Sequence, residues 1–201
     1  MTQTEHVVDE TTPKPPRADA RRNRLRVLAA AKEAFEAEGA SVSVETIARQ
    51  AGVGVGTVYR HFPTKEALFE AIIVTTFEAL LEEARGLADA DDAGAALYGY
   101  LARLFEESET SKAIKEALGG SEFDPSESAK QLFSNLERAV GVLLQRAQAS
   151  GDTRSDVTVE EVFALVGGAC QASHAMGGGA TSSLRLCSVI CDGLRPPAAR
   201  A

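Results

Sequence analysis

The chain has 201 residues, of which 44% are hydrophobic, 25% charged and 5% aromatic, and its formal net charge is −8. This is the composition of an ordinary soluble globular protein, and no apolar run approaches the roughly 20 residues that span a bilayer. Residues 1–20 are polar and proline-containing, unlike a signal peptide, and an odd number of late cysteines excludes a secreted disulfide framework, so we expect a cytoplasmic protein.

The first third of the chain predicts short helices with clear ends. Apolar residues at spacings of three and four give a first helix that Gly39 ends. Ser43 is a typical N-cap for a second helix, which Gly52 ends, and Thr64 is the N-cap of a fourth. The predicted elements are a disordered tail at 1–19 and helices at 21–38, 44–51, 55–61 and from Lys65 onward.

The remainder predicts one helical hairpin after another, with no strand and no repeat. The fold class is therefore all-α, with an N-terminal three-helix domain and a C-terminal helical domain. The expected domain limits are 20–65 and 66–195, with a flexible tail at 196–201. The further helices are centred on residues 68–87, 97–105, 114–118, 132–144, 159–170 and 184–194.

The second and third helices are joined by a glycine-containing turn, Ala51-Gly52-Val53-Gly54. A helix-turn-helix needs such a tight turn, because its second helix must project into a DNA major groove roughly 12 Å wide. An ordinary helical hairpin with a glycine turn is the alternative. The exposed side of the third helix offers groups for phosphate and base contact, namely Val55, Gly56, Thr57, Tyr59, Arg60 and His61.

Charge is distributed unevenly along the chain. Residues 11–65 contain ten Lys or Arg against five Asp or Glu, whereas the remainder from residue 66 contains eleven against twenty-one. A basic first domain joined to an acidic second one is typical of a DNA-binding protein whose second domain does not face DNA. This pattern favours the helix-turn-helix over the ordinary hairpin.

One series of residues without internal gaps runs through these first helices: Arg24, Val27-Leu28, Ala30-Ala31, Phe35, Gly39, Ile47-Ala48, Ala51-Gly52-Val53, Thr57, Tyr59, His61-Phe62 and Lys65-Glu66-Ala67-Leu68. At these positions residues 24–70 resemble the TetR (tetracycline-repressor) family of regulators. A weaker resemblance to actinobacterial-type ligand domains of that family lies in Gly167-Gly168 and residues 191–196.

The resemblance implies roles in DNA binding. Thr57, Tyr59 and His61 would touch phosphates, Lys65 would clamp the DNA backbone, and Arg24 would face the groove. Arg21 and Arg22 would extend into the minor groove. The predicted DNA-binding residues are Arg24, Ser43, Val55, Gly56, Thr57, Tyr59, Arg60, His61 and Lys65.

Two positions depart from the family pattern. The recognition helix usually opens with a serine cap and a polar residue, where this chain has Gly54 and Val55. Glycine still serves as an N-cap, but valine offers a base only an apolar contact with a thymine methyl. We therefore expect direct readout to depend on Thr57, Arg60 and the deformability of the operator.

The resemblance places dimerisation on the last two helices, which would form a four-helix bundle with the partner. Simple packing within one chain is the alternative. The apolar residues predicted at the dimer interface are Val162, Phe163, Val166, Leu186, Val189 and Ile190.

Aromatic side chains of the middle helices are candidates for an effector pocket, although an aromatic stripe is more often plain core. Few charged residues face inward, which favours an apolar or weakly polar small molecule. The predicted pocket residues are Phe77, Tyr98, Phe105, Phe133 and His174.

The cysteines allow a second interpretation of the last helices. Cys170 and His174 are four residues apart, as are Cys187 and Cys191, so zinc binding or oxidation sensing stays open. Small buried side chains are the more ordinary reading, because free cysteine behaves as a small hydrophobe. We expect no metal and no cofactor.

Together these features predict a homodimeric DNA-binding regulator, a repressor by default, that binds a pseudo-palindromic operator and is released by a small-molecule effector. No nucleophile or phosphate-loop spacing supports catalysis. A helical enzyme and a dimeric helical binding protein without DNA affinity remain the alternatives, which substrate turnover and salt-dependent DNA binding would distinguish.

Overall fold

The computed structural model describes residues 16–38, 42–117, 126–176 and 180–196, and within these ranges it contains eight α-helices and no strand. The all-α prediction is confirmed. The helices are α1 (Pro16–Glu38), α2 (Val44–Ala51), α3 (Val55–His61), α4 (Lys65–Gly86), α5 (Ala93–Ala117), α6 (Glu127–Ala149), α7 (Val159–Ala175) and α8 (Ala180–Leu194). No described helix is long and apolar enough to cross a membrane.

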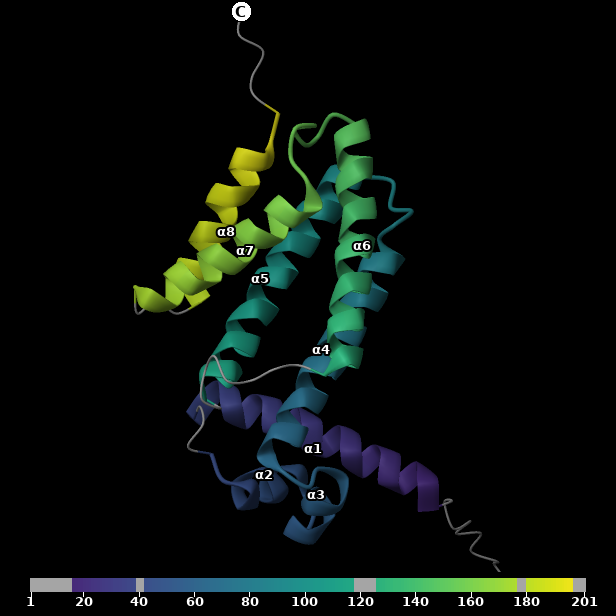
Figure 1. The fold of residues 1–201 in the computed structure, drawn as a ribbon, viewed down its shortest axis with the longest axis vertical. Helices are drawn as coiled ribbons and strands as arrows, with labels where there is room; N and C mark the ends of the chain where they lie inside the picture. Colours follow the sequence, from purple (N-terminus) through teal and green to yellow (C-terminus); the bar gives the residue numbers. More distant parts are fainter. Residues whose placement is uncertain (1–15, 39–41, 118–125, 177–179, 197–201) are drawn as a thin grey trace, which may run out of the picture.

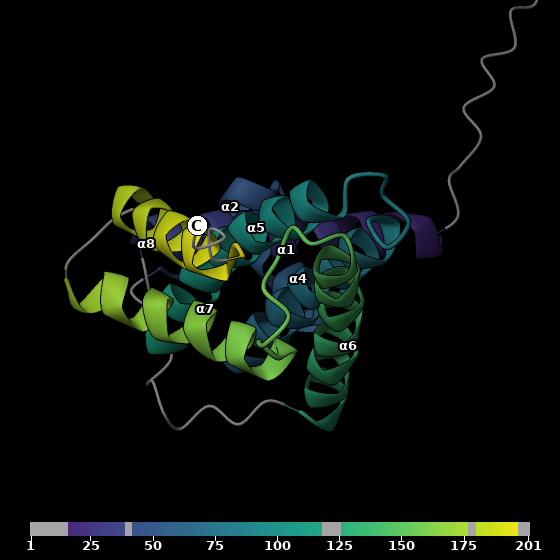
Figure 2. The same cartoon turned by 90° about the horizontal axis from the view of Figure 1, so that it is seen from above.

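The molecule has two parts, which Figure 1 shows one above the other. We call α1, α2, α3 and the first two turns of α4 the head, and the rest of α4 with α5–α8 the body. In the head, α1 crosses beneath the body, and α2 and α3 pack against α1. In the body, α4, α5 and α6 are long and steep, while α7 and α8 lie beside each other at one side (Figures 1 and 2).

The head has an apolar core of its own. Phe35 of α1, Ile47 of α2, Val58 of α3 and Phe69 of α4 are at most 1% exposed and belong to one cluster. Full burial of such a side chain contributes about 1.5–3 kcal/mol, so short helices that are marginal alone become stable together. This core fixes the orientation of α3 relative to α1.

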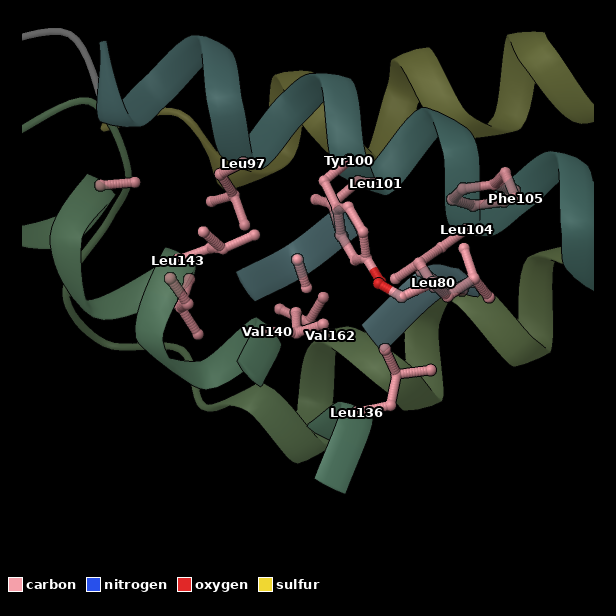
Figure 3. Packing of buried hydrophobic residues seen from close by; sticks show 14 of the residues in the cluster. Leu80, Leu97, Tyr100, Leu101, Leu104, Phe105, Leu136, Val140, Leu143 and Val162 are labelled. Carbon is pink, nitrogen blue, oxygen red and sulfur yellow. The ribbon is translucent and has the colours of Figure 1, made fainter. Parts of the chain in front are cut away.

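The body has a second core, formed by residues of α4 to α8, and Figure 3 shows its part between α4, α5, α6 and α7. Tyr100 lies at its centre, 1% exposed, and its hydroxyl donates a hydrogen bond of 2.8 Å to the carbonyl of Leu80. Burial raises the pKa of Tyr100 well above its usual range, so the phenol stays neutral. The helix α4 contributes to both cores, with residues 68–72 in the first and 80–84 in the second.

The structure differs from the sequence-based helices at two places. The first helix begins at Pro16 rather than Arg21, because proline suits a first helical position and Asp19 favours the positive end of the helix dipole. The separate helices predicted at 97–105 and 114–118 are one helix, α5, up to Ala117. No glycine or proline interrupts residues 100–117, and Leu118 lies outside the described residues.

Candidate DNA-binding surface

The turn between α2 and α3 is built by caps and one left-handed residue. Ser43 precedes α2 in an extended conformation, and its hydroxyl accepts a hydrogen bond of 3.1 Å from the amide of Thr46. Gly52 ends α2 with φ 63° and ψ 38°, a conformation that favours glycine. Gly54, extended at φ −72° and ψ 147°, then precedes α3 without a side-chain cap. These local features set the angle between the two helices.

The third helix presents one polar side to solvent. Val58 is 1% exposed and anchors α3 in the head core, while Val55 is half-buried against the same core. Tyr59 is 47% exposed and Arg60 is also exposed. Thr57 and His61 are half-buried. Gly56, also predicted to contact DNA, is exposed, with open space where a Cβ would stand.

Two basic side chains flank α3 from other helices. The Arg24 guanidinium of α1 stacks over the ring of Phe62, 5.1 Å from its centroid, at the C-terminal end of α3. Lys65, the first residue of α4, donates a hydrogen bond of 3.0 Å to the carbonyl of Val42 and lies 5.4 Å from the ring centroid of Phe35. The Lys65 ammonium is therefore fixed beside the N-terminus of α2.

Further polar residues near α2 and α3 are not among the DNA-binding residues predicted from the sequence. Thr46 and Arg49 follow Ser43 at spacings of three on α2, and hydrogen bonds connect Ser43 to Thr46 and Thr46 to Arg49. Arg26 of α1 lies beside the turn, its Nη1 3.8 Å from where a Cβ of Gly52 would stand. The i, i+3 spacing from Ser43 is the signal that identifies the first two. For Arg26 only the tertiary packing reveals the position.

The predicted pocket residues do not gather at one place. Phe77 of α4 and Phe133 of α6 have ring centroids 5.7 Å apart, and Phe163 of α7 joins them at 5.4 Å from Phe133. Phe105 is 1% exposed in the body core. Tyr98 lies near the α6–α7 connection, where its hydroxyl donates to the carbonyl of Asp152 at 3.0 Å. The side chain of His174, the fifth predicted pocket residue, lies outside the described part of the chain.

One hollow among the described residues has a volume of about 380 Å³ and lies on the outside of α6 and the start of α7. It contains none of the predicted pocket residues. Its lining is Ser134, Glu137, Arg138, Gly141, Val142, Gln145, Val159 and Glu160.

The predicted interface residues face two ways. Val162 and Val166 are 1% and 3% exposed, so within one subunit they belong to the body core. Phe163, Leu186 and Ile190 are half-buried, whereas Val189 is 60% exposed. The outer side of α7 instead carries Leu165, Gly167 and Gly168, all exposed.

The cysteines lie on the inner sides of α7 and α8. Cys170 and Cys187 are buried, and the sulfurs of Cys187 and Cys191 are 4.0 Å apart. Burial raises the pKa of Cys187 to about 12 and raises that of Cys191, so both are thiols at neutral pH. Within the described ranges, no group of three or more His, Cys, Asp or Glu side chains is arranged to hold a metal ion.

Two family models match this chain. Residues 27–72 match the model described as "Bacterial regulatory proteins, tetR family". Residues 92–196, half of the chain, match "Transcriptional regulator SbtR-like, C-terminal domain", a TetR C-terminal domain model.

Solved structures and a curated relative agree with these models. A TetR transcription regulatory protein from Mycobacterium vanbaalenii is 38% identical, with a TM-score of 0.72 over 90% of this chain and 100% of that one. The TetR transcriptional regulator SCO0520 from Streptomyces coelicolor is 34% identical, with a TM-score of 0.70 over 87% and 99%. An HTH-type transcriptional regulator from Staphylococcus aureus (strain USA300) is 34% identical over 74 residues, 36% of this chain and only 40% of that relative.

Proposed function

The chain belongs to the TetR family of DNA-binding transcriptional regulators, and we propose that it acts as a homodimeric repressor that a small-molecule effector releases from a pseudo-palindromic operator. Repression needs only occupancy of a promoter. Two recognition helices of a dimer would enter successive major grooves roughly 34–36 Å apart, which requires an inverted repeat.

The observation that carries this proposal is the polar side of α3 on a rigid head. Tyr59 and Arg60 project from a helix that Val58 anchors in the core, so the backbone entropy of ordering α3 is spent before DNA arrives. Gly56 adds a position without a side chain, where a DNA backbone can approach closely. We assign Thr57, Tyr59 and His61 to phosphates and Arg60 to a base edge or phosphate.

The flanking residues complete the proposed surface. Arg24 is supported by its stack on Phe62 at the end of α3. Lys65 holds a positive charge at the carbonyl of Val42, one residue before the N-cap Ser43, and the N-terminus of α2 there already favours an anion. Val55, half-buried as it is, would contribute at most an apolar contact with a thymine methyl.

Dimerisation is proposed on the outer sides of α7 and α8. Leu165 is 46% exposed, Leu184 52% and Val189 60%, and the two adjacent helices that carry them would together offer a partner an apolar surface. Gly167 and Gly168 cost about 1 kcal/mol each relative to alanine in a helix, and close approach of a partner helix would offset that cost. Val162 and Val166, buried within the subunit, would support this interface from behind.

The effector is proposed to act on the aromatic cluster of Phe77, Phe133 and Phe163, which joins α4, α6 and α7. An apolar molecule that displaces Phe77 would shift α4, and α4 also carries residues 68–72 of the head core. A coupling of about 1–3 kcal/mol weakens operator binding by about 5–150-fold.

The first experiment is selection of genomic fragments by the purified protein, followed by measurement of affinity against salt for the recovered sequences. We expect an inverted repeat, binding that falls steeply with salt, and less transcript from the recovered promoter when the protein is added. Failure to recover any fragment at low salt would contradict DNA binding. An increase in transcript would contradict repression but not DNA binding.

Two arginine variants locate the DNA-binding surface. If Arg60 contacts a base, Arg60→Ala should weaken operator binding by about 1–3 kcal/mol. If it contacts a phosphate, its loss in both subunits of the dimer should reduce the steepness of log K against log salt by about 2. Arg85→Ala is the matched control, because Arg85 is equally a solvent-exposed helical arginine but lies at the far end of α4. Equal operator affinity of the two variants would show that α3 is not the reading helix.

A further inference from the structure

The two apolar cores share no buried residue among those described, so α4 and the packing of α1 against α5 join the head to the body instead of one common core. The helix α4 runs through both, and residues 74–76 between the cores are only half-buried. A single helix as the joint would leave the head free to tilt around it. A second attachment is therefore of interest, and α1 provides one through its contact with α5.

That attachment is centred on Glu107 of α5. It is 5% exposed and is the one charged residue among the buried side chains that the structure describes. Lys32 of α1 donates to both carboxylate oxygens, at 2.9 and 2.7 Å, across 75 positions of sequence. Arg103 of α5 pairs with the same carboxylate at 2.6 Å.

The network continues to a third helix. The Arg103 guanidinium also lies 3.7 Å from a carboxylate oxygen of Glu83 on α4 and 3.6 Å from one of Glu106. One carboxylate thus connects α1, α5 and, through Arg103, α4. Burial opposes the charge of Glu107, but the hydrogen bonds and charges of Lys32 and Arg103 outweigh it and lower its pKa, so the group is ionised at neutral pH.

We propose that Glu107, held by Lys32 and Arg103, is a positioning residue that fixes the orientation of the DNA-binding head on the body. A buried ion pair contributes directional geometry more than stability, because desolvation consumes much of its attraction. An apolar joint of the same size would tolerate several tilt angles, whereas the two short bonds from Lys32 select one. The effect on operator affinity rests on the proposed function, since only a correctly spaced pair of heads fits successive grooves.

The test replaces the ion pair with apolar side chains of similar length. Lys32→Met removes the bond between helices while Arg103 still pairs with Glu107, and Lys32→Met/Glu107→Met removes the buried charge as well. Lys32→Arg keeps the cation and is the conservative variant. The matched control is Glu82→Met/Arg85→Met, an exposed pair on α4 with a 2.9 Å contact that does not join two helices.

We expect the double variant to keep or exceed wild-type thermal stability and yet to bind operator less tightly. If the competent orientation falls to about a tenth of the population, the apparent Kd rises about tenfold. The salt slope should not change, because Lys32 is used here as an internal contact and not as a phosphate contact. Lys32→Arg should recover most of the affinity, and the control pair should match the wild type.

Amide hydrogen exchange provides a readout that does not depend on DNA. Loss of the anchor should let the head open separately, so amides of α1–α3 should exchange faster relative to those of α5 and α6 in the double variant. If the wild type binds no DNA, the proposed function fails, and this ratio still decides the role of Glu107. An unchanged exchange ratio, or operator binding within twofold of the wild type by a folded double variant, would overturn the proposal.

Discussion

Replacing Gly52 with alanine measures the backbone cost of the turn that orients the recognition helix. Gly52 has φ 63° and ψ 38°, in the left-handed region. A Cβ there would meet only the Arg26 guanidinium at 3.8 Å, an ordinary contact, so no steric clash adds to the effect. A left-handed conformation costs a non-glycine residue about 1–2 kcal/mol, and we expect Gly52→Ala to lower the free energy of unfolding by that amount.

The same substitution four residues later should have the opposite sign. Gly56 is the second residue of α3 and has a negative φ, and nothing stands within 4 Å of its added Cβ. Alanine is favoured over glycine in a helix by about 1 kcal/mol, so Gly56→Ala should stabilise the protein. The two variants are therefore expected to differ by about 2–3 kcal/mol.

Thermal unfolding followed by circular dichroism, without DNA and at one protein concentration, checks this difference. For a chain of this length 1 kcal/mol corresponds to about 2–4 °C, so the two Tm values should differ by about 4–12 °C. If Gly52→Ala and Gly56→Ala shift Tm in the same direction, the assignment of a strained turn at Gly52 is refuted.

Three further predictions concern the body. Leu165→Glu/Val189→Glu should convert the dimer to a monomer in sedimentation velocity. Val142→Glu, at a similarly exposed apolar position on α6, should leave the dimer intact, and equal behaviour of the two variants would place the interface elsewhere. Tyr100→Phe loses a buried hydrogen bond to the α4 backbone and should lower the free energy of unfolding by about 1 kcal/mol in urea titration; no loss would show that this bond contributes little. Burial raises the pKa of Cys187 to about 12, so at pH 8 iodoacetamide should alkylate it far more slowly in the native protein than in urea, as peptide mass spectrometry would show; equal rates would contradict its burial.

The ends of the head helices were predictable because their signals are local. Ser43 caps α2 and Thr64 caps α4 with their own hydroxyls, and Gly52 ends α2 in the left-handed conformation, which favours glycine. Each of these effects acts within four residues of chain. The order of helices and the position of the turn therefore follow from the sequence without knowledge of the packing.

Local signals were less informative where a helix end depends on distant contacts. The sequence favoured a break between residues 105 and 114, yet α5 continues to Ala117. The resemblance and the apolar residues of the last two helices also predict Val162 and Val166 at the dimer interface, and in the structure both are buried within the subunit. Periodicity identifies an apolar side of a helix but does not say which neighbour covers it, because that depends on how α7 rotates against α5 and α6.

The sequence by itself determined the all-α class, the helix-turn-helix and the polar side of α3, since caps, glycines and helical spacing act at short range. The tertiary structure alone decided where Lys65 directs its ammonium, which aromatic rings meet, and that Lys32 and Glu107 bind each other. These contacts join residues that lie 23 to 75 positions apart, and their energy is gained only when several helices have packed. No short window of sequence contains both partners, so only the folded chain fixes how the head is placed on the body.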